Sequence, residues 1–564
     1  MKTKWFKDAF IYQIYPRSFC DGNGDGIGDI RGIISKLDYL KDLGINAVWL
    51  SPCYKSPNDD NGYDISDYRD IMEEFGTLDD WKEMVKGMHD RGIKLIMDLV
   101  VNHTSDEHAW FVESKKSTDN PYRDYYFWKK GRGKDGKKPP NNWISRFGGS
   151  AWTYDENTDE FYLHLFSKKQ PDLNWDNPKV REEVKGIVKY WLDLGADGFR
   201  CDVITYISKV EGLPDGKLGG DNMFTHGPNI HKYLQELYTD VLSKYDCMTV
   251  GEAAGVTTDQ AKLYTGNGRG ELDTVFQFEH VEVNTFAQIV PRKVKLNRIK
   301  EVLSKWQTEL FGNGWNSLYL ENHDQPRCVS RYINDNVDGD DFLRKQSAKM
   351  LMTMMYFQQG TPYVYQGQEI GMTNIEFHSE EEHVDVLSKT VFRLVKKYAP
   401  FLKGYAMRAL AIRSRDNART PMQWNAEKNA GFSDGLPWYR VNPNYTTINT
   451  EEALKDPDSV LNFLKKIIEI RKGNETIRDG RYIDIQKDSK DLFAYRREAE
   501  VETLEIICNY KNKEVNYRAD AKLIGKGAKI ELILSNYQNI AYDQAEYRDF
   551  ILKPYECRVY SIKK

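Results

Sequence analysis

Apolar positions recur with helical spacing in the first half of the chain, and each such segment runs into a short apolar stretch. Ile33, Leu37, Leu40 and Leu43 share one face of a predicted helix, Gly44 is suited to end that helix, and NAVWLSP follows as a predicted strand. The pattern predicts a helix followed by a buried strand.

The same unit occurs three more times. Thr77 and Asp80 form a predicted capping box ahead of a helix, Asn177-Pro178 opens another helix, and a third covers about residues 230–242. The runs that follow are IKLIMDLVVNH, ADGFRCDVI and CMTVGE. Strands that are apolar throughout and separated by helices indicate a parallel sheet covered on both faces. We therefore predict an α/β fold in which this sheet closes into a (β/α)8 barrel.

Two long interruptions and a change of period divide the chain. Residues 104–173 lack helical periodicity and predict a loop-rich inserted domain after the third strand, and a second insertion spans about 371–452 after TPYVYQG. Beyond about residue 480, alternating segments such as ETLEIIC and KIELILS predict a C-terminal antiparallel β-sandwich. The expected domains are a barrel at 1–103 and 174–480, an inserted domain at 104–173 and a sandwich at 481–564.

Composition narrows the class of protein. The formal net charge of the 564 residues is −5 and hydrophobic residues make up 40%, which disfavours a nucleic-acid partner. No run of about 18 uncharged apolar residues occurs, and the first residues do not resemble a signal peptide. The seven scattered cysteines form no CxxC pair. We expect a cytoplasmic protein without a membrane partner, a disulfide framework or a zinc site. A monomer is the favoured oligomeric state.

Polar residues stand where the predicted strands end. They are Asp98, His103, Arg200, Asp202, Glu252, His323 and Asp324. In a barrel of this type the reacting groups lie at these carboxyl ends, on one face. Because side chains alternate along a strand, Arg200 and Asp202 should point the same way and Cys201 toward the helices.

Several carboxylates at apolar strand ends need an explanation, because burying a carboxylate without a partner costs several kcal/mol. Isolated salt bridges between strands are one explanation, but the carboxylates outnumber the arginines. Clustered like charges raise the pKa of one member above the others. Two carboxyl groups of unequal proton affinity are what cleavage of a glycosidic bond requires.

Seven stretches resemble glycoside hydrolase family thirteen, the α-amylase family, and within it the oligo-1,6-glucosidase branch. They are GINAVWLSP, DLVVNH, QPDLNW, GFRCDVI, TVGE, ENHDQPR and GTPYVYQGQEIGM, in the family's order. The resemblance covers most of the first 480 residues. It implies an exo-acting, retaining α-glucosidase that acts on a small oligosaccharide or disaccharide.

The resemblance also implies roles for individual residues. Asp202 matches the nucleophile, Glu252 the general acid/base and Asp324 the third carboxylate. The remaining matches are in the substrate pocket: Arg200 beside the nucleophile, His103 and His323 at the cleaved sugar, and Asp60, Tyr63 and Arg415 closing the pocket around a terminal glucose.

The loop DGNGDGIGDI alternates oxygen-bearing side chains with glycine. Counting from Asp21, position twelve is Gly32, where a calcium-sensing EF-hand needs a bidentate acid, so the sensor interpretation fails. Asp21, Asn23, Asp25, Asp29 and the Ile27 carbonyl are hard oxygen ligands suited to Ca²⁺, with Mg²⁺ as a second candidate. The resemblance implies a structural cation here; the alternative is a glycine-rich turn with solvated aspartates.

Residues around the second sugar bear on the substrate. Val203 after the nucleophile resembles enzymes of this branch that act on α-1,6 bonds, which favours isomaltose, isomaltooligosaccharides and panose. Ala253 and Ala254 after Glu252 lack the aromatic residue of the sucrose isomerases, and Leu320-Glu321 replaces a tryptophan-asparagine pair. A sucrose-active α-glucosidase or sucrose isomerase, a trehalose-6-phosphate hydrolase and a non-catalytic barrel relative are the alternatives.

Overall fold

The computed structural model describes residues 4–286, 290–337, 339–519, 529–538, 547 and 549–563. Eight parallel strands form its central sheet, in the order β11-β10-β9-β5-β2-β1-β15-β14. Their bounds are β1 Ile11–Ile14, β2 Ala47–Leu50, β5 Lys94–Leu99, β9 Gly198–Cys201, β10 Met248–Glu252, β11 Thr274–Phe276, β14 Ser317–Tyr319 and β15 Thr361–Tyr365. A parallel bridge between Val275 and Asn316 joins the two outer strands and closes the ring.

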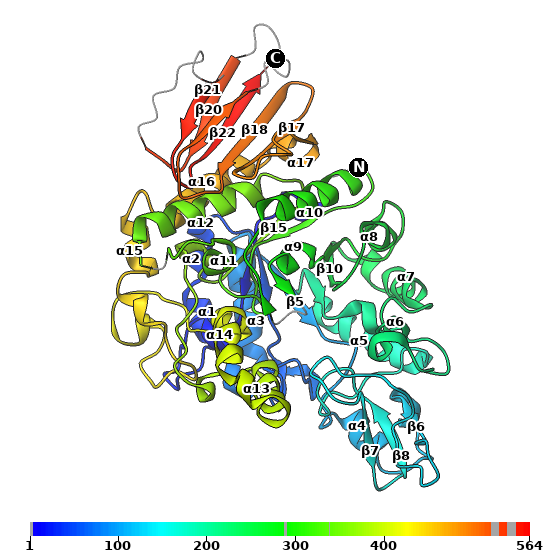
Figure 1. Ribbon diagram of the computed structural model, residues 1–564. Coiled ribbons are helices and arrows are strands. Elements are labelled where there is room, and N and C mark those ends of the chain that lie inside the picture. Colours follow the sequence, from blue (N-terminus) through cyan, green and yellow to red (C-terminus); the bar gives the residue numbers. More distant parts are fainter. Residues whose placement is uncertain are drawn as a thin grey trace.

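Helices separate the strands along the chain and surround the ring (Figure 1). They are α1 Ile30–Ser35, α2 Leu37–Leu43, α3 Leu78–Asp90, α5 Pro178–Leu194, α6 Asp221–Phe224, α7 Ile230–Asp240, α8 Thr258–Thr265, α9 Glu279–Glu282, α10 Leu296–Glu309, α11 Cys328–Tyr332 and α12 Asp341–Tyr356. This is the predicted (β/α)8 barrel.

Local signals account for several helix ends. Thr77 and Asp80 make the reciprocal capping box of α3, and the side chain of Asn177 caps α5 ahead of Pro178. Gly44 and Gly195 end α2 and α5 with φ of 94° and 114°, values that a residue with a Cβ rarely adopts. The helical face predicted across Ile33 to Leu43 is split at one residue, so that two short helices replace one.

The barrel interior is filled by side chains from alternate strand positions. The inward cluster contains Ile11, Ala47, Trp49, Ile96, Met248, Val250, Phe276, Tyr319 and Tyr363, all almost completely buried. The outward side chains form a second, larger core with the helices, and Cys201 belongs to it. The barrel is therefore packed with apolar side chains below its carboxyl-end face.

The inserted segment leaves the barrel after β5 and returns before α5. An antiparallel bridge between His103 and Asp172 ties its two ends together. It contains α4 Ala109–Ser114 and a three-stranded sheet in the order β6-β8-β7, with bounds Trp128–Lys129, Glu160–Leu163 and Trp152–Asp155. The insertion therefore stands directly over the carboxyl ends of the strands.

The segment after β15 carries further helices, α13 Val386–Tyr398, α14 Lys403–Arg413, α15 Thr450–Lys455, α16 Val460–Arg471 and α17 Glu475–Asp479. It ends in an antiparallel sheet of β16 Arg481–Asp484, β17 Leu492–Glu498, β18 Glu502–Asn509, β22 Cys557–Lys563 and β20 Lys529–Ser535, in that spatial order. A second sheet pairs β19 Val515–Arg518 with β21 Asp549–Leu552. In the described part of the chain, no helix is long and apolar enough to cross a membrane.

Candidate active site

One buried guanidinium connects three carboxylates at the carboxyl ends of β5, β9 and β10. Arg200 Nη1 lies 2.9 Å from Asp98 Oδ1 and 2.6 Å from Asp202 Oδ1. Its Nη2 lies 2.5 Å from Glu252 Oε2. Asp202 and Glu252 therefore share one cation, and this contact holds them at the same point of the barrel face.

The two carboxyl groups compete for one proton. Burial raises the pKa of Glu252 to about 7, Arg200 opposes this, and the charges of Asp202 and Asp324 raise it further. Burial also raises the pKa of Asp202 to about 7, while Arg200 and a hydrogen bond with Glu252 act to lower it. A hydrogen bond between two carboxyl groups requires a proton on one of them. The pair therefore holds one proton beside the positive charge of Arg200, which contacts both carboxyl groups.

Asp324 is held ionised by two arginines. Its Oδ1 lies 2.8 Å from Arg419 Nη2 and 3.3 Å from Arg415 Nη1. Burial alone would raise the pKa of Asp324, but its charged neighbours hold it well below the usual range. Burial lowers the pKa of His323 to about 3, so this histidine is neutral at pH 7 and the arginines supply the charge.

Asp385 fixes the two arginines in turn. Its Oδ1 lies 2.6 Å from Arg415 Nη2 and 3.3 Å from Arg419 Nη1. The same carboxylate accepts hydrogen bonds from the backbone N–H groups of Leu387 and Ser388 at the start of α13. The arginine pair thus has a buried anchor that does not itself contact Asp324.

A chain of hydrogen bonds orients the histidine beside Asp324. Gln13 Nε2 lies 2.8 Å from His323 Nδ1, and His323 Nε2 lies 2.8 Å from the Tyr63 hydroxyl. That hydroxyl donates to Asp98 Oδ2 at 3.0 Å, and the Tyr63 and His323 rings stack at 5.4 Å. Because the Gln13 amide N–H donates to Nδ1 of the neutral His323, the ring proton of His323 lies on Nε2. This nitrogen faces Tyr63 and Asp324.

His103 and Asp60 belong to the same hydrogen-bond network as Tyr63. His103 Nε2 lies 3.0 Å from the Tyr63 carbonyl oxygen, and burial lowers its pKa to about 4. Gln170 Nε2 donates to Asp60 Oδ2 at 3.2 Å and to the Tyr63 carbonyl. Asp60 Oδ1 lies 3.7 Å from Arg415 Nη2, so one ion pair joins the loop after β2 to the segment after α14.

Val203 has an unusual backbone conformation. Its φ of 35° and ψ of 39° lie in the left-handed region, which is strained for a β-branched residue by about 1–3 kcal/mol. In this conformation its N–H donates to Glu252 Oε2 at 3.1 Å. Its side chain packs against the apolar core of the inserted domain, beside Tyr206 and Phe166. Val203 therefore links the inserted domain to Glu252.

The structure brings all ten predicted catalytic and substrate-pocket residues into this one network. Sequence reasoning did not assign a role to Asp385, Arg419, Gln170 or Gln13. Gln170 lies inside the recognised stretch QPDLNW, and Arg419 follows Arg415 by four residues, so these two had a signal nearby in the sequence. Glu321, by contrast, is 1% exposed and contacts Arg327, so its side chain faces the interior rather than the second sugar.

The loop with the predicted cation ligands lies apart from this network. Asp21 accepts hydrogen bonds from the N–H groups of Asn23, Gly24 and Gly26 and from the Ser433 hydroxyl. Asp25 accepts from the Ile27 N–H, and Asp29 accepts from the N–H groups of Gly22 and Gly32. The loop is therefore folded tightly around its own carboxylates.

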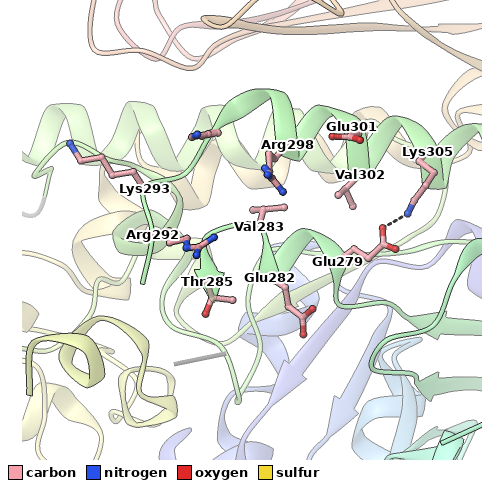
Figure 2. A pocket seen from close by; sticks show the side chains of 11 residues that line it. Glu279, Glu282, Val283, Thr285, Arg292, Lys293, Arg298, Glu301, Val302 and Lys305 are labelled. Carbon is pink, nitrogen blue, oxygen red and sulfur yellow. Dashed lines mark ion pairs between the residues drawn. The ribbon is translucent and has the colours of Figure 1, made fainter. Parts of the chain in front are cut away.

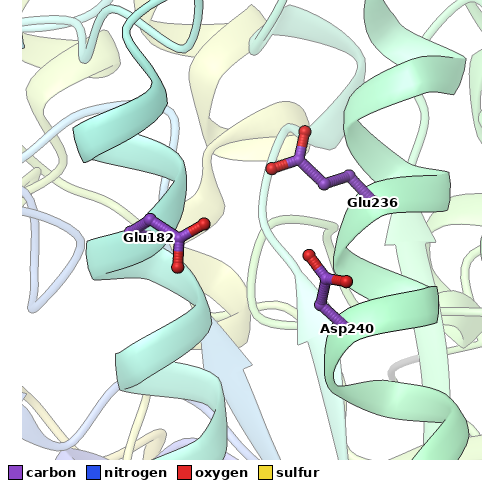
Figure 3. A group of neighbouring side chains, drawn as sticks. All are labelled: Glu182, Glu236 and Asp240. Carbon is purple, nitrogen blue, oxygen red and sulfur yellow. The ribbon is translucent and has the colours of Figure 1, made fainter.

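One group of three acidic side chains in the described residues is gathered closely enough for a metal ion. It consists of Glu182 on α5 with Glu236 and Asp240 on α7, which face one another across the two helices (Figure 3). Lys185 Nζ occupies the space between them, 2.8, 2.7 and 2.6 Å from their oxygens. This group therefore binds a lysine.

A hollow of about 500 Å³ lies between α9 and α10 (Figure 2). Its lining is mostly charged, with Glu279 paired to Lys305 at 2.5 Å, Arg298 on the facing helix and Arg292 ahead of that helix. It contains none of the residues of the network around Arg200. We assign it no catalytic role.

Comparison with known proteins places this arrangement in a family. Residues 13–480 match the model of the alpha amylase catalytic domain. The chain belongs to the alpha-amylase family. Within this family, the oligo-1,6-glucosidase of Parageobacillus thermoglucosidasius is 54% identical over 574 residues, covering 100% of both chains. This chain is thus a glycoside hydrolase.

Solved alpha-amylase-family structures superpose over the whole chain. A trehalose-6-phosphate hydrolase from Bacillus licheniformis has a TM-score of 0.94 at 45% identity, and an isomaltulose synthase from Klebsiella sp. LX3 has 0.94 at 41%. Each match covers 100% of both chains. Relatives of different printed activity therefore share this fold, so the fold alone does not decide which reaction is catalysed.

Proposed function

We propose that this alpha-amylase-family hydrolase releases glucose from the non-reducing end of short α-1,6-linked glucosides, with retention at the anomeric carbon. The observation that carries the proposal is the sharing of Arg200 by Asp202 and Glu252 at the carboxyl ends of neighbouring strands. A nucleophilic carboxylate about 5–5.5 Å from a protonated carboxyl group is the arrangement of a retaining glycosidase.

The reaction proceeds in two displacements. An oxygen of Asp202 bonds to the glucose C1 while the C1–O bond to the second sugar breaks, and Glu252 transfers its proton to the departing oxygen. Glu252, now ionised, takes a proton from water as the water oxygen bonds to C1 and the Asp202 ester bond breaks. Asp324, held ionised by Arg415 and Arg419, accepts hydrogen bonds from sugar hydroxyls, which strengthen as the ring distorts.

The exo mode is supported by the ion pair between Asp60 and Arg415. It crosses from the loop after β2 to the segment after α14 and lies beside Asp324. A pocket closed there accepts a terminal glucose and excludes the middle of a longer chain. The relative from P. thermoglucosidasius supports the α-1,6 linkage by its printed name, and Val203 supports it by its position against Glu252.

We expect isomaltose to be hydrolysed with a higher kcat/KM than maltose. A difference of a few methyl groups at the second sugar site is worth about 1–3 kcal/mol, or roughly 5- to 150-fold. Side-by-side kinetics with isomaltose, panose, maltose, sucrose and trehalose 6-phosphate measure this ratio, and Val203→Thr should lower it. Faster turnover of maltose than of isomaltose, or turnover confined to sucrose or trehalose 6-phosphate, would contradict the proposed preference for α-1,6-linked substrates.

We also propose a structural Ca²⁺ in the loop at Asp21–Asp29, with Mg²⁺ as the weaker candidate. The support is its donor set: the carboxylates of Asp21, Asp25 and Asp29, the Asn23 amide and the Ile27 carbonyl offer hard oxygens. The bond from Ser433 to Asp21 joins the loop to the segment after α14. The ion would thus stabilise this junction without taking part in catalysis.

Removal of this ion should lower the melting temperature by about 2–4 °C, because a ligand that binds only the folded state stabilises it in proportion to its affinity. Thermal unfolding with EDTA, with excess Ca²⁺ and with excess Mg²⁺ measures the shift. Asp21→Asn should unfold at the same temperature under all three conditions. If neither EDTA nor Ca²⁺ changed the melting temperature of the wild type, the proposed site would be refuted.

A further inference from the structure

The helical hairpin of α13, the turn Pro400–Leu402 and α14 carries an unusual surface. Six large apolar side chains are exposed along it: Ile412 near the end of α14, and five that lie close together in the sequence. The exposed fractions of these five are 43% for Leu394, 70% for Tyr398, 84% for Phe401, 41% for Leu402 and 44% for Tyr405. All five lie between residues 394 and 405, at the end of α13, in the turn and at the start of α14. We name these five residues the hairpin tip.

The hairpin is also strongly basic. Residues Val386 to Arg413 contain seven lysines and arginines and neither aspartate nor glutamate, although the whole chain has a net charge of −5. Among the residues that the structure describes, Lys389, Arg393 and Lys397 form no ion pair. Lys396 and Lys403, at the end of α13 and the start of α14, pair with Glu380 of the acidic turn Glu380–Glu382. The tip thus combines apolar and cationic groups.

The position of the hairpin leaves this surface open. In Figure 1, α13 lies on the side of the barrel away from the C-terminal sheets, with α14 next to it. The inner face is packed, with Phe392, Ala406 and Leu410 forming a small core between the two helices. The tip residues are therefore not needed to hold the hairpin together. A cluster of exposed apolar side chains of this kind marks an interaction surface.

We propose that the hairpin tip is a docking surface for an anionic lipid bilayer. Exposed aromatic and aliphatic side chains that flank lysines and arginines bind at the boundary between headgroups and acyl chains. The cations complement the negative surface potential of such a membrane, and the exposed apolar side chains complement its acyl layer. The expectation of no membrane partner rested on the lack of a spanning segment and did not consider a surface of this kind.

A second copy of this chain is the less favoured occupant. In a two-fold interface, the same cationic patch would face itself across the contact, and like charges would repel. A bilayer presents fixed negative charge and an apolar layer together, which fits both features of the tip.

Flotation of the full-length protein with vesicles tests the proposal. We expect it to float with vesicles containing about 30% phosphatidylglycerol in phosphatidylcholine, to stay behind with pure phosphatidylcholine, and to release in high salt. Tyr398→Ser combined with Phe401→Ser should lower the partition about tenfold or more. Arg393→Gln combined with Lys397→Gln should weaken binding and reduce its salt dependence.

Val501→Ser provides the matched control, because Val501 is 72% exposed in the C-terminal domain and should bind vesicles like the wild type. Unchanged hydrolysis of p-nitrophenyl α-glucoside shows that each variant is folded. The proposal is overturned if the wild type does not float, if the tip variant floats equally well, or if that variant converts a dimer to a monomer in sedimentation velocity. The last result would identify a second copy as the occupant.

Discussion

Replacing Asp202 by asparagine is expected to lower kcat on p-nitrophenyl α-glucoside by about 10⁴-fold or more. The reason is that removing a covalent nucleophile leaves only binding and positioning. Asparagine keeps the shape of the side chain and removes a buried charge, so the protein should stay folded. Steady-state kinetics with a melting curve on the same sample measure both effects.

Cys201→Ala is the matched control for this variant. Cys201 is the neighbouring residue on β9, but its side chain lies in the outer core between strand and helices. Its replacement should change kcat only a few-fold while creating a small cavity. The assignment of the nucleophile would be wrong if Asp202→Asn retained wild-type turnover, or if the two variants lost activity equally.

Replacing Glu252 by glutamine should lower kcat by about 10²–10⁴-fold on isomaltose, because the departing sugar oxygen then leaves without a proton. The loss should be much smaller in the first step with a 2,4-dinitrophenyl glucoside, whose leaving group needs no proton. Comparing the two substrates by pre-steady-state kinetics separates acid catalysis from a general loss of structure.

The pH profile of the wild type should be bell-shaped around pH 7. The active form carries one proton on the pair of Glu252 and Asp202, and burial raises the pKa of each to about 7. Activity is lost as pH falls, because Asp202 then gains a proton, and as pH rises, because Glu252 then loses its proton. Glu252→Gln should abolish the alkaline limb of kcat/KM. An alkaline limb that survived in this variant would exclude Glu252 as the acid.

The fold was predictable where signals lie close together in the sequence. The capping box of Thr77 and the glycines that end α2 and α5 act within one helical turn, so the helix boundaries follow from neighbouring residues. The break at Lys36 was not predictable from apolar spacing, because the same face continues across it. Periodicity reports which side is buried, not whether the helix is continuous.

The site was predictable where polar groups interrupt apolar strands, as at Asp98, Arg200 and Glu252. The anchoring of Asp324 was not, because Arg419, which contacts it, and Asp385, which holds Arg419, lie 95 and 61 positions further along the chain. Only the folded barrel brings these charges together. The left-handed conformation of Val203 runs against its own preference and is imposed by its surroundings. Residue type therefore gave no indication of it.

The hairpin of α13 and α14 illustrates a third limit. The sequence indicated only an insertion at about 371–452. A basic segment with several aromatic residues is compatible with a buried pair of helices and with an exposed one. Whether Tyr398 and Phe401 are covered depends on what packs against them, and the structure leaves both exposed.

The decisive measurement is the mass of the protein after reaction with 5-fluoro-α-glucosyl fluoride, whose ring fluorine slows hydrolysis of a glucosyl ester more than its formation. We predict an adduct of one fluoroglucosyl group per chain, located by peptide mapping on the carboxylate of Asp202. An adduct on Asp98, Asp324 or Glu252, or β-glucose as the first product released from isomaltose, would contradict the mechanism derived from this geometry.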